Sequence, residues 1–114
     1  MTGNKKDRKG LLKSFVSEHP QGWDHRSWER LLEELEAAGI STADPQSIGR
    51  ELEHERLSQM LERLPVKGIG PKRRQVLLST YGRVWELRGA PAGEIARLPS
   101  FNPKLAEELV EALP

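Results

Sequence analysis

One stretch decides the fold: Leu64-Pro-Val-Lys-Gly-Ile-Gly-Pro-Lys-Arg-Arg-Gln-Val-Leu-Leu78. An apolar helix end runs into Gly68, Ile69 and Gly70, and Pro71 begins a new helix at once. Two glycines around one apolar residue predict a tight hairpin, because glycine takes positive φ without penalty. Proline suits the first helical position, where its missing N–H is not needed.

Positive charge is concentrated at the start of this new helix. Lys72, Arg73 and Arg74 lie in its first turn, where free backbone N–H groups and the helix dipole are already positive. Three cations there cost stability, so an anion is the expected partner, and a phosphate suits the arrangement. Consecutive residues point about 100° apart, so we expect Lys72 and Arg73, with the Gly68 and Gly70 amides, to bind phosphate in preference to Arg74. The alternative is an ordinary turn between two helices.

These residues resemble the hairpin of the helix-hairpin-helix motif. Short helices are expected around Val76, around 84–87 and around 94–97, and a second turn, Leu98-Pro-Ser-Phe-Asn-Pro-Lys104, precedes a last helix over 105–110. This order resembles the tandem helix-hairpin-helix domain, (HhH)2, at the C-terminus of the excinuclease C family of nucleotide-excision nucleases and of the XPF-type nucleases. The resemblance covers roughly residues 56–113.

The second turn departs from the family pattern. Ser100 and Asn102 stand where the family usually has glycines. Asparagine tolerates the left-handed region best among the other residues, so the turn is expected to survive. Two interpretations stay open: a structural pseudo-repeat, or a second DNA contact through the amides near Asn102 and the side chain of Lys104.

Charge is divided unevenly along a chain whose net charge is only +1. Residues 24–62 hold ten acidic side chains against four arginines, whereas residues 63–88 hold seven basic side chains against Glu86 alone. Such a concentrated basic segment is typical of a protein with a polyanionic partner. No apolar run reaches the length of a membrane span, and the absence of cysteine fits a cytoplasmic protein.

The predicted fold class is all-α, because alternating apolar residues typical of strands are absent. We expect a basic disordered tail over residues 1–9, an N-terminal unit of three helices over 10–55, and an (HhH)2 domain of five short helices over 56–114. The step from Leu52 to Leu57 breaks helical spacing and predicts a kink or a boundary near 54–56. A helix-turn-helix with its recognition helix at 45–54 is a weaker alternative, because acidic residues surround Arg50.

No nucleophile–base set or metal-ligand spacing is present, so we expect no enzyme and no cofactor. The family resemblance implies that hairpin carbonyls, here those of Val66 and Gly68, can hold a monovalent cation. The aromatic residues Trp23, Trp28 and Trp85 lie beside leucines, which favours core packing over base stacking.

The predicted function is sequence-independent DNA binding, in DNA repair or related processing. Hairpin amides and basic side chains would hold phosphates across the minor groove, and the resemblance implies two hairpins on duplex or branched DNA, with a nuclease or another repair protein as partner. Neither a membrane nor a small-molecule substrate is expected. The alternatives are a protein-interaction or dimerisation module and, less favoured, a preference for single strands or RNA. The expected DNA contacts are Lys67, Gly68, Ile69, Gly70, Lys72, Arg73, Arg74, Asn102 and Lys104.

Overall fold

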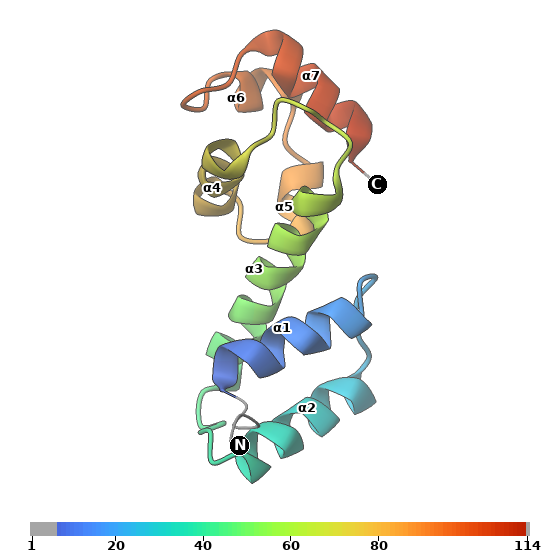
Figure 1. Cartoon of the computed structure of the whole chain (residues 1–114), viewed down its shortest axis with the longest axis vertical. Coiled ribbons are helices and arrows are strands. Elements are labelled where there is room, and N and C mark those ends of the chain that lie inside the picture. The colour runs from blue at the N-terminus through green and yellow to red at the C-terminus, as the bar shows by residue number, and fades with distance from the viewer. Residues whose placement is uncertain (1–6, 114) are drawn as a thin grey trace. The chain divides into compact units, whose positions relative to one another are not determined.

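The computed structural model describes residues 7–113, and within this range it contains seven helices and no strand (Figure 1). The all-α prediction is therefore confirmed. The chain divides into two compact units, Met1–Glu55 and Arg56–Pro114, and each is described by itself. Within the described range, none of the helices combines the length and apolar character that crossing a membrane requires.

The N-terminal unit contains α1 (Arg8–Glu18), α2 (His25–Ala37) and the first part of α3 (Pro45–Arg63). Each helix begins after an aspartate whose carboxylate accepts a backbone N–H three residues later, as helix caps do. The pairs are Asp7 with Gly10, Asp24 with Ser27, and Asp44 with Ser47. Each cap satisfies an N–H group that the helix itself leaves without an acceptor.

The cap at Asp7 corrects one expected boundary. The predicted disordered tail ended at Lys9, but α1 already begins at Arg8 because the Asp7 carboxylate accepts the Gly10 N–H at 2.7 Å. Arg8 is also tied to the third helix of the unit, where its guanidinium pairs with Glu51 at 3.0 Å. The remainder of the predicted tail, residues 1–6, lies outside the described residues.

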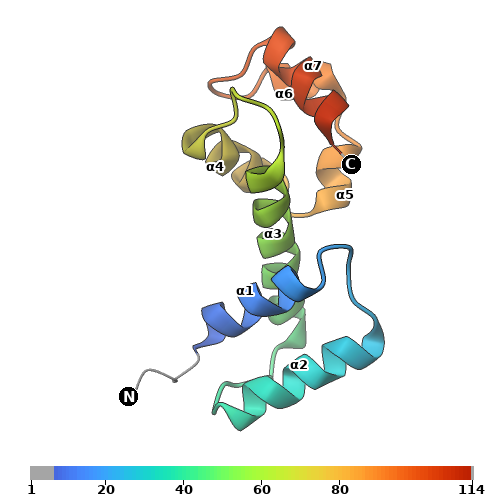
Figure 2. The same ribbon diagram turned by 45° about the vertical axis from the view of Figure 1, so that its right-hand side comes forward.

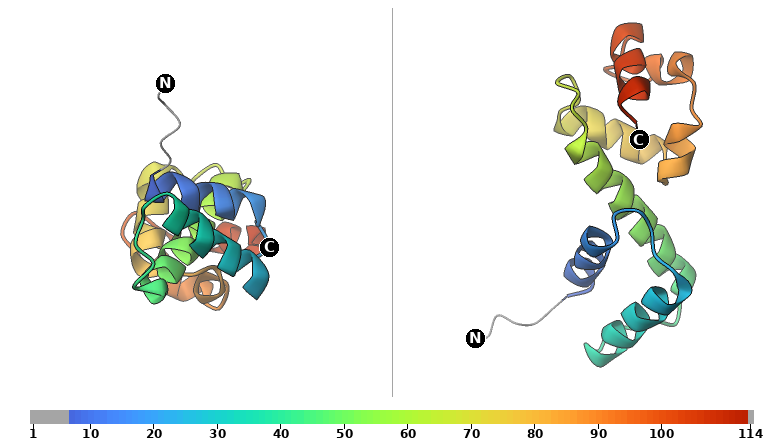
Figure 3. Two further views of the ribbon diagram at one scale, coloured as in Figure 1. Left: turned by 90° about the horizontal axis from the view of Figure 1, so that it is seen from below. Right: turned by 90° about the vertical axis from the view of Figure 1, so that its right-hand side faces the viewer.

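Apolar side chains from all three helices form the core of the N-terminal unit. Phe15, Leu35 and Leu52 lie in this cluster, and Trp23 and Trp28 pack against it, as their positions beside leucines predict. Phe15 makes an edge contact with Trp23, with ring centroids 5.3 Å apart. Figure 3 shows α1 and α2 from two further directions.

The third helix continues through the segment where a kink or boundary was predicted. α3 runs without a break from Pro45 to Arg63, so the alternative recognition helix at 45–54 does not end there. Leu52 and Leu57, the apolar residues on either side of the predicted kink or boundary, pack in different clusters. Leu52 belongs to the N-terminal cluster and Leu57 to the C-terminal one, and both are fully buried.

The C-terminal unit contains the end of α3 and four short helices, α4 (Pro71–Thr80), α5 (Val84–Arg88), α6 (Ala92–Ala96) and α7 (Pro103–Ala112) (Figure 2). These are the five helices expected from the sequence. Their shared core is built mostly of leucines and other aliphatic side chains: Leu57, Leu61, Leu77, Val84, Leu87, Ile95, Ala106 and Leu109. The two loops of interest, 64–70 and 97–102, lead into α4 and α7.

A buried tyrosine links two of these helices. Tyr81 ends α4, and its hydroxyl donates a hydrogen bond to the Glu94 carboxylate on α6, at 2.6 Å. Burial raises the pKa of Tyr81 well above its usual value of 10, and the bond to Glu94 raises it further. The folded protein therefore keeps the phenolic proton at pH values where the unfolded chain loses it.

We expect this hydrogen bond to make stability depend on pH in the alkaline range. Its contribution is complete below about pH 10 and is lost as the pH rises towards the raised pKa, because only the unfolded chain then releases the proton. Tyr81→Phe should cost about 1–2 kcal/mol near pH 8, and the difference from wild type should shrink above pH 10. Thermal unfolding of both proteins over a pH series measures this. Tyr81 is the chain's single tyrosine, so tyrosinate absorbance reports its titration directly. A wild-type tyrosine that ionises like a free one would contradict the expectation.

Candidate nucleic-acid interface

The loops before α4 and α7 have matching backbone hydrogen bonds, 32 residues apart in the sequence. In the first, the Ile69 N–H donates to the Val66 carbonyl at 3.2 Å, and in the second the Phe101 N–H donates to the Leu98 carbonyl at 3.1 Å. A proline follows in each case as the first residue of the helix. We call residues 66–70 the first hairpin and residues 98–102 the second hairpin.

The helix starts also correspond. The carbonyl of Gly70 accepts the Arg74 N–H at 3.0 Å, and the carbonyl of Asn102 accepts the Ala106 N–H at the same distance. Lys72 and Lys104 therefore occupy the same position, second in their helices. The second hairpin thus repeats the first in its backbone.

The glycines of the first hairpin serve a different purpose from the one predicted. Neither Gly68 nor Gly70 has a positive φ, so the expectation that the turn needs glycine for its conformation is wrong. A Cβ atom on Gly68 would lie 2.6 Å from Cδ1 of Leu105, well inside contact distance, whereas a Cβ on Gly70 would meet nothing within 4 Å. Gly68 therefore leaves room for the Leu105 side chain of α7 to lie against its backbone.

The second hairpin corrects the prediction in the same way. The left-handed residue is Ser100, with φ of 70°, and not Asn102, whose φ is −144°. Asn102 instead caps α7, because its side-chain oxygen accepts the Leu105 N–H at 2.8 Å. The equivalent cap in α4 is Gly70, which has no side chain to offer. The N–H groups of Lys72 and Arg73 in α4 therefore have no capping acceptor, whereas the equivalent N–H of Leu105 in α7 is satisfied.

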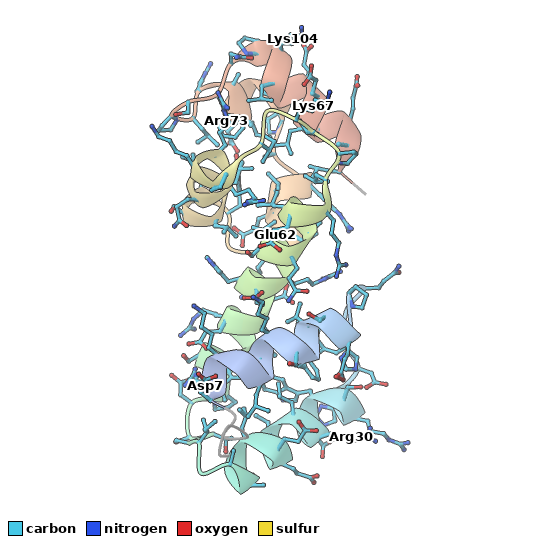
Figure 4. The ribbon with its side chains drawn as sticks, in the orientation of Figure 1. Asp7, Arg30, Glu62, Lys67, Arg73 and Lys104 are labelled. Carbon is cyan, nitrogen blue, oxygen red and sulfur yellow. The ribbon has the colours of Figure 1, made fainter. Side chains whose placement is uncertain are left out.

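The predicted lysines are exposed around these hairpins. Lys67, Lys72 and Lys104 lie on the surface, and Arg74 is half-buried. Figure 4 shows Lys67, Arg73 and Lys104 on the same end of the C-terminal unit. Ile69, by contrast, is only 8% exposed, so its side chain belongs to the core and only its backbone can face a ligand.

Arg73 differs from the lysines because two of its five N–H donors are already bonded to backbone carbonyls. Its Nε donates to the Ser100 carbonyl at 2.7 Å, and its Nη1 donates to the Gly68 carbonyl at 2.8 Å. The guanidinium therefore bridges the first and second hairpins. Both carbonyls of the expected monovalent-cation site already accept hydrogen bonds. The Gly68 carbonyl accepts one from the positively charged Arg73, and the Val66 carbonyl accepts one from the Ile69 N–H.

Other features of the described chain fall outside this surface. Among residues 7–113, no group of three or more histidine, aspartate or glutamate side chains is placed to hold a metal ion. Trp85 corrects another prediction: it is 62% exposed rather than packed in the core. The short helix α5 is anchored by its neighbours Val84 and Leu87, which are buried, so Trp85 is directed outwards.

Known proteins match the C-terminal unit. Residues 58–113 match the family model described as a SAM-like helix-hairpin-helix tandem. This segment is a helix-hairpin-helix tandem. The predicted resemblance is thereby confirmed for the C-terminal unit, and the correspondence of the two hairpins is the repeat within the tandem.

The relatives of the tandem are bacterial proteins named UvrABC system protein C. That of Photobacterium profundum is 50% identical over 48 residues, which are 42% of this chain and 8% of that protein. That of Alcanivorax borkumensis is 41% identical over 56 residues, which are 49% of this chain and 9% of that protein. The chain therefore spans less than a tenth of the length of these relatives. No solved structure matches the chain significantly.

Sequence reasoning missed three residues that shape the tandem: Ser100, Leu105 and, in its bridging role, Arg73. A usable signal was present in the spacing. Aligning Pro71 with Pro103 pairs Gly68 with Ser100, Lys72 with Lys104, and Arg73 with Leu105. That alignment predicts the equivalent lysines, whereas the contacts between the hairpins need the tertiary structure.

Proposed function

We propose that the helix-hairpin-helix tandem binds duplex DNA through its phosphates, without reading sequence, in DNA repair or related DNA processing. The observation that carries the proposal is the repeated arrangement of Lys72 and Lys104, one at the start of each hairpin helix. An exposed lysine beside the open N-terminal amides of a helix favours a phosphate oxygen. Contacts of this kind position a protein on DNA but carry no sequence information.

The two hairpins would contact the duplex together. Each presents one helix start and one lysine, so the pair can hold phosphates on both strands across the minor groove. The first hairpin is the stronger anion site, because Gly70 leaves the α4 amides open and Lys67 adds a further exposed charge. The match to UvrABC system protein C relatives supports a role in DNA repair. A nuclease or another repair protein is the partner that we propose.

Fluorescence anisotropy on duplex, branched and single-stranded DNA over a salt series tests this proposal. We expect wild-type binding to duplexes of unrelated sequence with equal affinity. The double variant Lys72→Glu/Lys104→Glu should bind roughly 100-fold more weakly near 100 mM salt, with the log–log salt slope reduced by about two, one for each phosphate contact. No metal ion or cofactor is proposed, so exchanging sodium for potassium at constant ionic strength should leave the affinity unchanged.

A matched control separates local contacts from net charge. Arg30→Glu/Arg50→Glu changes the charge of the chain by the same amount at two exposed positions of the N-terminal unit. This control should keep most of the affinity and the full salt slope. If the control and the hairpin variant weaken binding equally, or if wild type does not bind, the phosphate contacts proposed at the hairpins are wrong.

A second candidate function rests on Trp85. Exposed tryptophans are enriched among the residues that dominate protein–protein binding, and Trp85 and Val110 are large apolar residues exposed on the tandem. If the chain fails to bind DNA of any form, we propose a protein-interaction or dimerisation module that uses α5. Analytical ultracentrifugation of wild type and Trp85→Ala measures self-association directly.

A further inference from the structure

The contacts of Arg73 with both hairpins assign it a role other than phosphate binding. A guanidinium presents five N–H donors in a rigid planar fork, and here one on Nε and one on Nη1 donate to the carbonyls of Ser100 and Gly68. These carbonyls lie 32 residues apart in the sequence and occupy the same position in the two hairpins. The positive charge of Arg73 therefore lies between the hairpins, on oxygen atoms of the protein itself.

The second hairpin returns a contact at the equivalent position. Leu105 corresponds to Arg73 in the repeat, and its Cδ1 approaches the backbone of Gly68 so closely that a Cβ there would lie 2.6 Å away. Arg73 of the first half thus reaches Ser100 of the second, and Leu105 of the second half reaches Gly68 of the first. One contact is polar and the other apolar. Together they fix the spacing of the hairpins from both sides.

We infer that Arg73 is a positioning residue that joins the two hairpins into one DNA-binding unit, and that it is not itself a phosphate ligand. The inference rests on the proposed function, in which Lys72 and Lys104 contact phosphates at the same time. Two contacts made by a rigid body cost the entropy of association only once, whereas two loosely joined hairpins must each be ordered on the DNA. Fixing their spacing therefore raises the affinity for a duplex.

The test compares Arg73→Lys and Arg73→Gln with Arg88→Lys and Arg88→Gln, at an exposed arginine of α5 that is not among the expected DNA contacts. Lysine keeps the charge but not the planar fork, so it cannot bridge two carbonyls as arginine does. We expect Arg73→Lys to lose duplex affinity about as much as Arg73→Gln, on the order of tenfold, although only Arg73→Gln changes the charge. Arg88→Lys should bind like wild type. If Arg73→Lys retains wild-type affinity and only Arg73→Gln binds more weakly, Arg73 is a phosphate ligand and the inference is overturned.

Heteronuclear NMR distinguishes positioning from a loss of folding. Without DNA, Arg73→Lys should speed amide hydrogen exchange at the second hairpin, around Phe101, while Leu77 in the core stays protected. With DNA, the amides of the first hairpin should still shift in Arg73→Lys, whereas those at 102–105 should shift less than in wild type. Unchanged exchange at the second hairpin in both Arg73 variants would refute the bridge.

A variant of Leu105 and the exchange measurements without DNA complete the test. Leu105→Val has a shorter side chain and therefore weakens the contact of residue 105 with Gly68. If the two contacts act together, it should also speed amide hydrogen exchange at the second hairpin. If wild type binds no DNA, the proposed function fails, but the exchange measurements without DNA still decide whether Arg73 couples the hairpins. Loss of protection throughout the unit in every variant would mean that Arg73 serves general stability, which also overturns the inference.

Discussion

Leu57→Ala is expected to lower the stability of the helix-hairpin-helix tandem by about 2–5 kcal/mol, because it removes a buried leucine and leaves a cavity in the core. Leu57 is 0% exposed and lies in the cluster with Leu77, Leu87 and Leu109. In a unit of this size the melting temperature should fall by on the order of 10 °C or more. Amide hydrogen exchange at Leu77 measures the effect within the tandem.

Leu52→Ala is the matched control on the same helix. Leu52 is also 0% exposed but belongs to the cluster of the N-terminal unit. It should accelerate exchange at Leu35 and leave Leu77 and the duplex affinity near their wild-type values. If both variants accelerate exchange at Leu35 and Leu77 alike, the two cores unfold as one cooperative structure, and the expectation is wrong.

Gly68→Ala should cost about 1–3 kcal/mol, because the added methyl group forces Leu105 out of its packed position. A Cβ at this position would lie 2.6 Å from Leu105 Cδ1, and Leu105 is itself buried in the tandem. Leu105 must then shift its side chain, and Lys104 is its neighbour at the start of α7. We therefore expect thermal unfolding at a lower temperature and, in the anisotropy assay, weaker duplex binding.

Gly70→Ala provides the comparison at the other glycine. Gly70 has φ of −92°, which any residue adopts, and a Cβ there would meet nothing within 4 Å. The cost should stay below about 1 kcal/mol, the difference between glycine and alanine at a helix cap. Equal destabilisation by both substitutions would show that the turn needs glycine for its conformation, contrary to the backbone angles.

Local sequence signals predict most of the helices. Pro71 begins α4 as its sequence predicts, and the second turn leads into α7 at Pro103. These signals depend on residues a few positions apart, so they can be recognised without the tertiary structure. The pattern places the start of α1 two residues late, because a capping aspartate inside a basic segment is hard to distinguish from the rest of a polar tail.

The errors concern contacts between distant segments. Nothing near Gly68 in the sequence indicates that Leu105 will approach its backbone, and nothing near Arg73 indicates that the Ser100 carbonyl will accept its Nε proton. The prediction for Trp85 is wrong because leucine-rich surroundings do not reveal which side of a five-residue helix faces the core. The basic segment can be identified from charge alone, but charge does not separate a lysine in solvent from an arginine bound to carbonyls.

The second hairpin shows that a sequence search for helix-hairpin-helix motifs cannot rely on glycines alone. A search pattern with two obligatory glycines describes Gly68-Ile-Gly70 and rejects Ser100-Phe-Asn102, although both turns share their hydrogen bonds and both lead into a proline. Of these two glycines, only Gly68 lacks room for a side chain, because Leu105 in the second half of the repeat lies against it. A pattern that weights the proline, the apolar residue two positions before it and the following lysine would recover both copies from one chain.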